Sequence, residues 1–145
     1  MNIVNYNEKY FNLFLDCFLL FWEEKWVNIN KELVISNLTK KLNQDSKNLY
    51  LYILDKKVIW FIWGKILISE NMFLNNSYKL HISYLFIMKN YTWKWYASDL
   101  KKILLENNKW IKKVSLNVNL KNLNAINIYK KWWFKEKFFY MDLNL

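Results

Sequence analysis

Scarce glycine and absent proline limit how tightly this chain can turn. Its 145 residues include a single glycine, Gly64, and no proline, but nine tryptophans. An average glycine content of about 7% would give roughly ten glycines in a chain of this length. Backbone positions with positive φ exclude large side chains. An α/β fold with many glycine turns therefore conflicts with the composition as written.

The length and composition fit one globular domain spanning residues 1–145. Hydrophobic residues make up 54% of the chain and charged residues 23%, which is typical of a folded domain. The longest apolar stretch, residues 10–22, is interrupted by Asn12 and Asp16 and is shorter than the roughly 18 residues of a membrane-spanning helix. Asn7 and Glu8 stand where a secretory leader would be apolar. We therefore expect a soluble cytoplasmic protein with no membrane partner.

The large positive charge does not by itself identify a partner. The formal net charge is +10, and all 22 basic residues are lysine. Such a charge is compatible with nucleic acid, a membrane surface or a polyanionic cofactor. Lysine and asparagine have AT-rich codons, however, so part of the charge can reflect nucleotide bias in the gene.

The single cysteine, Cys17, indicates no redox or metal chemistry. One cysteine cannot form an internal disulfide, and no metal-ligand spacing surrounds it. We therefore interpret Cys17 as a small buried hydrophobe on a helix, and we predict no metal site.

Hydrophobic periodicity predicts alternating helices and strands without a linker or repeat. Asn7 and Asn30 are plausible N-caps for the first two helices, and Val34, Leu38 and Leu42 form an i, i+4 stripe in the second. A turn at residues 55–57 and a loop at residues 69–77 separate expected strands. The expected strands are 3–4, 49–54, 58–68, 78–88, 114–120 and 134–143, and the expected helices are 8–22, one after Asn30, 96–107 and 124–131. This order favours a single α/β or α+β domain, with a mixed, mostly antiparallel sheet of about six strands flanked by about four helices.

A strand, loop and helix in the middle of the chain carry the first motif. The strand is residues 81–87, and the loop that follows reads Tyr-Thr-Trp-Lys-Trp-Tyr-Ala from Tyr91 to Ala97. With glycine in place of Trp93 and Trp95, this loop resembles the Gln/Arg-x-x-Gly-x-Gly/Ala loop of the GNAT superfamily of acetyl-CoA-dependent N-acetyltransferases.

A second motif lies downstream, at residues 122–134. It begins at Asn122, contains Ala125 and Tyr129, and ends with Trp133 and Phe134. This spacing is similar to the Asn-x-x-Ala-x-x-x-Tyr-x-x-x-Gly-Phe pattern of the same superfamily. Trp133 stands where the pattern has glycine. The resemblance covers nearly the whole chain and implies a sheet with a splayed central pair of parallel strands.

Two further tryptophans occupy positions where the superfamily commonly has glycine. Trp60 lies in the strand of residues 58–68, and Trp110 follows the central helix, where a glycine C-cap is usual. Our hypothesis is that UGA codons, decoded as glycine in the source lineage, are translated here as tryptophan at Trp60, Trp93, Trp95, Trp110 and Trp133. UGG codons at these positions would contradict it. Trp22, Trp63 and Trp132 are compatible with authentic tryptophan, and Trp26 is unassigned.

The resemblance implies where acetyl-CoA would bind and how it would react. Convergent backbone N–H groups at a helix N-terminus suit its diphosphate, and main-chain groups of the central strand would pair with its pantetheine arm. The implied binding residues are Leu85, Phe86, Ile87, Thr92, Trp93, Lys94, Trp95, Tyr96, Ala97, Ser98, Asn122 and Asn124. Tyr129 matches the tyrosine that protonates the departing thiolate. The implied reaction transfers the acetyl group to a primary amine of a protein or a small molecule.

The resemblance leaves the general base and two alternative functions open. Many relatives have a glutamate near the positions of Ser83 and Tyr84, but this chain does not. Candidate bases are Glu23, Glu24, Glu70 and His81, although His81 also fits a strand residue with local hydrogen bonds. One alternative function is a basic, aromatic-rich module that binds single-stranded nucleic acid. The other is an inactive acetyltransferase fold used only for interaction.

Overall fold

A computed structural model describes residues 2–25, 28–71, 74–91 and 96–137, without the side chains of residues 69–76, 96 and 97. Its described strands form one five-stranded sheet in the order β1-β2-β3-β4-β5. The strands are β1 (Asn2–Asn5), β2 (Leu49–Leu54), β3 (Lys57–Asn71), β4 (Leu74–Ile87) and β5 (Val114–Leu116). The helices are α1 (Phe11–Glu23), α2 (Lys31–Gln44), α3 (Tyr96–Glu106) and α4 (Leu123–Lys131), with 3₁₀ turns η1 (Glu8–Tyr10) and η2 (Lys89–Tyr91).

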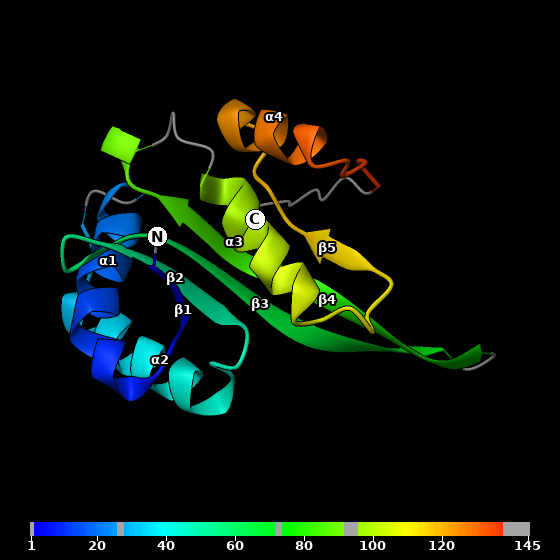
Figure 1. Ribbon diagram of the computed structural model, residues 1–145, viewed down its shortest axis with the longest axis horizontal. Coiled ribbons are helices and arrows are strands. Elements are labelled where there is room, and N and C mark those ends of the chain that lie inside the picture. The colour runs from blue at the N-terminus through cyan, green and yellow to red at the C-terminus, as the bar shows by residue number, and fades with distance from the viewer. Residues whose placement is uncertain (1, 26–27, 72–73, 92–95, 138–145) are drawn as a thin grey trace, which may run out of the picture.

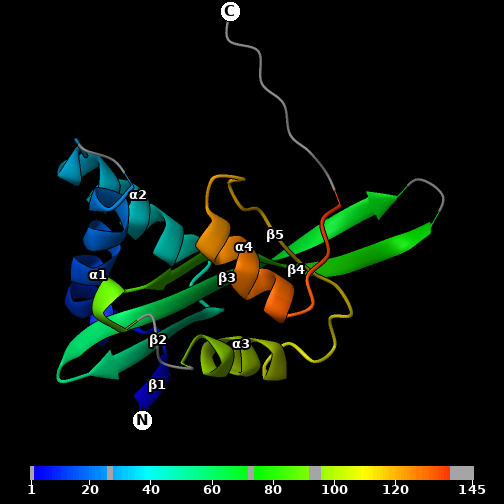
Figure 2. The ribbon, with the colours of Figure 1, turned by 90° about the horizontal axis from the view of Figure 1, so that it is seen from above.

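The sheet is mixed, as predicted, and helices cover both of its faces. Strands β1 to β4 pair antiparallel, and β4 pairs parallel with β5. Helices α1 and α2 lie against one face and α3 against the other (Figures 1 and 2). The sixth strand was predicted at residues 134–143. Its first four residues, Phe134 to Lys137, form no strand in the structure. The rest of that prediction, residues 138–143, lies outside the described residues.

Aromatic side chains dominate the core on the α1 face. Phe14 is fully buried, and its ring centroid lies 5.1 Å from that of Phe61 and 6.1 Å from that of Trp63, both edge-on. Such T-shaped pairs add to the free energy gained by burying the rings. Leu38 and Leu42 of the predicted stripe on α2 are buried in the same cluster. One continuous cluster of buried side chains therefore forms the core on this face.

The α3 face has a more aliphatic core. Leu100 and Leu104 of α3 are fully buried against Leu80 and Ile82 of β4. Trp60 of β3 is also fully buried in this cluster. The two faces thus share β3 and β4, whose alternating side chains enter both cores.

A side-chain N-cap explains the start of α2 but not the start of α1. The Asn30 side chain accepts a hydrogen bond from the Leu33 N–H at 3.0 Å, as its predicted role at the start of α2 requires. Asn7 precedes η1 and makes no side-chain cap hydrogen bond, and α1 begins only at Phe11. The predicted helix start at residue 8 is therefore correct only for a 3₁₀ turn.

The β2–β3 turn forms where it was predicted. Asp55 and Lys56 have φ values of 48° and 59°. Two successive positive φ angles define the type I′ turn, whose twist matches that of antiparallel strands. The chain builds this turn without glycine because aspartate tolerates the left-handed region better than most residues.

The predicted loop at residues 69–77 is wrong. Strand β3 continues to Asn71 and β4 begins at Leu74, with Ser69 paired to Ser77. The β3–β4 ribbon projects beyond the rest of the sheet (Figures 1 and 2). The main chain supplies the hydrogen bonds of a strand pair, so the asparagines and serines of this segment do not prevent strand formation.

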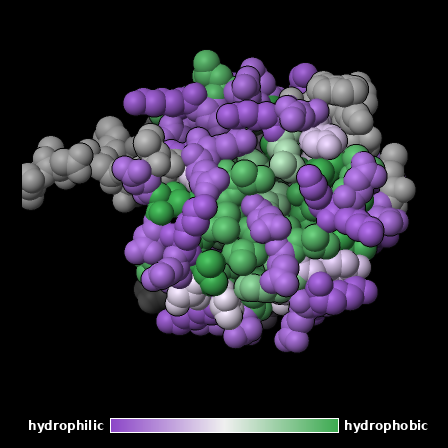
Figure 3. Space-filling model, turned by 90° about the vertical axis from the view of Figure 1, so that its left-hand side faces the viewer, coloured by the Kyte–Doolittle hydropathy of each residue, from purple (hydrophilic) through white to green (hydrophobic). Residues whose placement is uncertain are grey.

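The side of the molecule that holds α1 and the β2–β3 turn carries an apolar area. Figure 3 shows apolar residues at the centre of this side, surrounded by hydrophilic ones. Leu20 of α1 is among the exposed large apolar side chains, at 38%. Within the described ranges, no helix combines the length and apolar character needed to cross a bilayer.

Candidate active site

The parallel strands β4 and β5 diverge after three residue pairs. Leu80 pairs with Val114, His81 with Ser115 and Ile82 with Leu116. Strand β5 ends at Leu116, although the prediction extended it to residue 120, whereas β4 continues to Ile87. We call the gap beside residues 83–87 of β4, on the side of β5, the fork.

A β-bulge explains why the fork opens at this point. Trp63 pairs with Tyr84 and Gly64 with Ile82, so Ser83 has no opposite residue on β3. An extra residue in one strand bends that strand and increases its twist. The Ser83 hydroxyl is buried and has no hydrogen-bond partner among the described residues. The bulge therefore turns β4 away from β5 at the base of the fork.

The hydrogen-bond alternation shows which backbone groups face the fork. The Leu80 N–H donates to the Lys113 C=O at 2.9 Å on the β5 side, and the Met88 N–H donates to the Ile59 C=O at 3.0 Å on the β3 side. Backbone direction alternates along an antiparallel strand, and the bulge shifts the alternation by one residue. The N–H and C=O groups of Leu85 and Ile87 therefore face the fork, whereas those of Phe86 face β3. Phe86, one of the predicted binding residues, thus directs its main-chain groups to β3, and its side chain is buried in the α1-face core.

The start of α3 lies one short connection beyond the fork. Turn η2 follows β4, and α3 begins at Tyr96. Ser98 is exposed in its first turn, which also contains Asp99. The predicted binding residues Thr92, Trp93, Lys94 and Trp95 lie outside the described residues, as do the side chains of Tyr96 and Ala97. The structure thus places the helix N-terminus, whose free N–H groups suit an anion, close along the chain to Ile87.

Helix α4 carries the remaining predicted residues. Figure 1 shows α4 above α3 and the end of β5. The Asn122 side chain caps α4 by accepting a hydrogen bond from the Ala125 N–H at 3.1 Å, and Asn124 is exposed. The Lys101 ammonium lies 5.1 Å from the centre of the Trp132 ring, which links α3 to α4. Asn122 therefore has a structural role in the described contacts.

Tyr129 is partly buried on α4 among aromatic rings. Its ring centroid lies 5.9 Å from that of Trp132 and 6.0 Å from that of Phe134. Burial raises the pKa of Tyr129 above its ordinary value of 10.0, so the hydroxyl keeps its proton at neutral pH. A protonated phenol is the form that a general acid requires. The position of its hydroxyl at the fork stays a prediction.

The end of α4 places a tryptophan in a backbone conformation that favours glycine. Trp133 has φ 68° and is 90% exposed. Its N–H donates to the Lys130 C=O at 3.0 Å, and the Phe134 N–H donates to the Tyr129 C=O at 3.1 Å. These two bonds define a Schellman motif, whose left-handed residue is usually glycine.

The other four suspected glycine positions give a mixed result. Trp110 is 58% exposed and is not among the described residues with positive φ, so the backbone at this position does not favour glycine. Trp60 is fully buried in an extended strand and fills space in the α3-face core. Trp93 and Trp95 lie outside the described residues. Among the three described positions, Trp60, Trp110 and Trp133, the backbone itself therefore favours glycine at Trp133 alone.

The candidate bases occupy different environments. Glu23 pairs with Lys31 at 3.0 Å, and Glu24 lies 4.0 Å from Lys89. His81 Nδ1 lies 3.0 Å from the Ser115 hydroxyl across the β4–β5 pair. The side chain of Glu70 lies outside the described residues. Of the three described candidates, only His81 lies on the strand that forms the fork.

One polar contact near the fork was missed at the sequence level. The Lys41 ammonium on α2 donates to the Tyr84 hydroxyl at 3.1 Å and lies 4.4 Å from the centre of the same ring. Because 43 residues separate the two side chains, no local pattern could indicate the pair.

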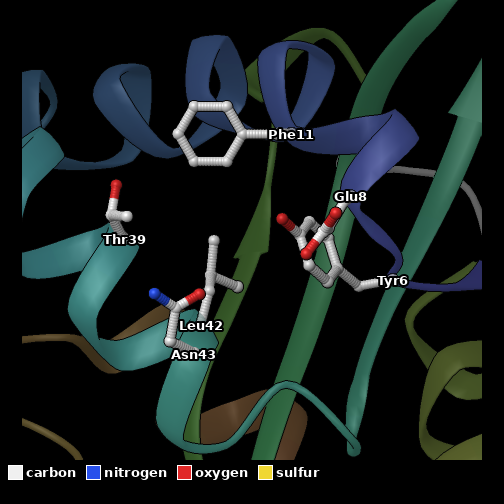
Figure 4. Close-up of a pocket in the computed structure, with 6 residues that line it drawn as sticks. All are labelled: Tyr6, Glu8, Phe11, Thr39, Leu42 and Asn43. Carbon is white, nitrogen blue, oxygen red and sulfur yellow. The ribbon is translucent and has the colours of Figure 1, made fainter.

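A hollow of about 290 Å³ lies elsewhere, between α1 and α2. Figure 4 shows its lining by Tyr6, Glu8, Phe11, Thr39, Leu42 and Asn43. These residues belong to α1, α2 and the segment after β1, not to β4 or β5, and none is a predicted site residue. Among the described residues, no group of three or more histidine, cysteine, aspartate or glutamate side chains could hold a metal ion.

Solved structures resemble this arrangement over the whole chain. No protein-family profile and no curated protein sequence matches the sequence of this chain. The aminoglycoside 6'-N-acetyltransferase AAC(6')-Ig from Acinetobacter haemolyticus superposes with a TM-score of 0.73 at 14% identity, covering 100% of this chain and 99% of that one. AAC(6')-Iy in complex with CoA gives a TM-score of 0.77 at 11% identity, covering 99% and 93%. The chain has the fold of these N-acetyltransferases.

The same fold also occurs in a protein described differently. A transcriptional regulator from Bacillus halodurans C-125 has a TM-score of 0.73 at 11% identity and covers 99% of each chain. At identities this low, the likeness to the acetyltransferases establishes the fold alone.

Proposed function

We propose that this chain is a GNAT-type N-acetyltransferase, which transfers the acetyl group of acetyl-CoA to a primary amine. The observation that carries the proposal is the fork, where β4 leaves β5 at the Ser83 bulge. The main-chain groups of Leu85 and Ile87, which face the fork, suit the amides of a pantetheine arm. The likeness to AAC(6')-Iy, which is solved with CoA, supports the same use of the fold.

Each end of acetyl-CoA would meet a chemically suitable part of the chain. The N-terminus of α3 offers free N–H groups and a positive dipole end to the diphosphate. A backbone N–H in the fork would polarise the thioester carbonyl and stabilise the oxyanion that forms during attack. Tyr129 would return a proton to the departing thiolate.

We further propose that the diphosphate loop requires glycine at Trp93 and Trp95. Main-chain amides can surround a diphosphate only where side chains leave room for it. The glycine-type backbone at Trp133 supports the decoding hypothesis at a position far from the loop. The chain with tryptophan at these positions is therefore expected to bind acetyl-CoA more weakly than the chain with glycine.

Thermal unfolding with acetyl-CoA tests the proposal on two chains. One carries the sequence as written, and the other carries glycine at positions 60, 93, 95, 110 and 133. At an acetyl-CoA concentration of about 100 times Kd, binding stabilises a protein by about 2.7 kcal/mol, which raises Tm by roughly 5–10 °C at this chain length. ADP at the same concentration, which lacks the pantetheine arm, should give a smaller shift.

The outcomes separate the three candidate functions. A Tm shift in neither chain would contradict the acetyltransferase proposal. Binding without thiol release in the presence of amines would favour an inactive interaction domain. Salt-sensitive stabilisation by a single-stranded oligonucleotide alone would favour nucleic-acid binding.

A further inference from the structure

We propose that His81, oriented by Ser115, is the general base that deprotonates the amine acceptor at the base of the fork. This inference rests on the proposed acetyl transfer and names the group that the sequence left unassigned. It identifies a further catalytic residue of that reaction.

His81 lies at the base of the fork. It is the middle residue of the three β4–β5 pairs, two residues before the Ser83 bulge. With a rise of about 3.3 Å per residue, this places His81 about 7 Å along the strand from the residue where the fork opens. A reacting amine in the fork would therefore be within reach of the imidazole through one bridging water.

The side chain of His81 lies on a defined face of the sheet. Its neighbours Leu80 and Ile82 enter the α3-face core, so alternation puts the His81 side chain on the opposite face. The start of α3, where the diphosphate would bind, belongs to the α3 face. A base on one face and the diphosphate on the other would let the amine and the thioester meet in the gap between the strands.

Hydrogen bonding and charge give the imidazole the form that a base requires. When Nδ1 holds the proton and donates to the Ser115 hydroxyl, 3.0 Å away, Nε2 carries the free lone pair. Burial first, and then Lys65 on β3 and Lys79 on β4, lower the pKa of His81 below its ordinary 6.5. The imidazole is therefore neutral at pH 7.

His81 Nε2 takes one proton from the acceptor ammonium, directly or through water, and releases it later to solvent. The neutral amine attacks the thioester carbonyl carbon, a C–N bond forms, and the C–S bond breaks. Tyr129 gives its proton to the thiolate and regains one from the amide nitrogen through water. The products are the acetylated amine, the CoA thiol and one proton.

NMR provides a test that needs no acceptor, because His81 is the only histidine in the chain. The protein for this test is whichever of the two chains, with tryptophan or with glycine at the five positions, acetyl-CoA stabilises. It is isotope-labelled, and the imidazole signals of His81 are followed as acetyl-CoA is added. We expect these signals to move on binding, and to titrate below pH 6.5 in the free protein. If the imidazole signals stay fixed while acetyl-CoA raises Tm, the proposed role of His81 is wrong, but the proposed function of the chain is not contradicted. If acetyl-CoA stabilises neither chain, the proposed function fails as well.

Kinetics with matched variants separates a catalytic role from a structural one. In His81→Gln the amide can still bond to Ser115 but cannot accept the proton. With poly-lysine and an aminoglycoside as acceptors, we expect thiol release to fall about 10²-fold in kcat/KM, with the acetyl-CoA Tm shift retained. Lys79→Gln removes a repelling charge, so the rising limb of the pH profile should move to higher pH with an unchanged plateau. A parental rate and pH profile in His81→Gln would contradict the proposal.

Discussion

The α1–α2 side of the sheet and the β5–α4 edge are held together in different ways. On the first side, Phe14, Phe18 and Phe21 of α1 are at most 4% exposed and contact one another or neighbouring rings. At the edge, all three residues of β5 are half-buried, and α4 has no buried residue. We therefore call the well-packed α1–α2 side the scaffold, which holds β4 in place, whereas the edge leaves β4 unpaired with β5 beyond Ser83.

Truncation of the scaffold core should have the largest effect. Phe14→Ala removes a fully buried ring and leaves a cavity among Tyr6, Phe61 and Trp63. We expect the free energy of unfolding in urea to fall by about 3–5 kcal/mol.

The matched control lies on α4. Leu123 is 66% exposed, so Leu123→Ala should change the free energy of unfolding by no more than about 0.5 kcal/mol. Equal losses in the two variants would show that the two regions do not differ as described.

The second prediction concerns chemistry at the edge. Tyr129→Phe removes the hydroxyl but keeps the ring that contacts Trp132 and Phe134. Loss of the general acid should lower kcat about 10²-fold, which corresponds to about 2.7 kcal/mol in the activation barrier. The urea midpoint should hardly change. A variant that unfolds more easily but keeps its kcat would assign Tyr129 to the scaffold instead.

The third prediction concerns the left-handed end of α4. Trp133→Gly relieves a positive φ that costs an L residue about 1–2 kcal/mol, less the extra entropy of glycine in the unfolded chain. We expect a gain of about 1 kcal/mol in unfolding free energy. Trp110→Gly has no positive φ to relieve and loses the contact with Tyr78, so it should be neutral or destabilising. A loss in Trp133→Gly would count against glycine at that position.

Sequence patterns predicted the scaffold better than the edge. The stripe of Leu38 and Leu42, the cap at Asn30 and the turn at Asp55 are local features, and the structure contains each of them. Local patterns failed in the ribbon from Ser69 to Ser77, where the strand pairing continues through residues that are typical of loops.

The fork was predictable only in part. The superfamily resemblance implied a splayed parallel pair, but the residue that creates it, Ser83, has no local signal that distinguishes a bulge from a regular strand. The bulge also decides that Leu85 and Ile87, and not Phe86, face the fork. The Ser115 hydroxyl reaches His81 from 34 residues away, and such a contact exists only after the sheet has formed.

Backbone NMR of the glycine-containing chain with acetyl-CoA tests the central claim most directly. If the fork binds acetyl-CoA through its main chain, the amide signals of Leu85 and Ile87 will shift at saturation, while those of Val4 and Leu51 on β1 and β2 will not. Shifts confined to the hollow around Tyr6 and Phe11, or no shifts at all, would contradict the account.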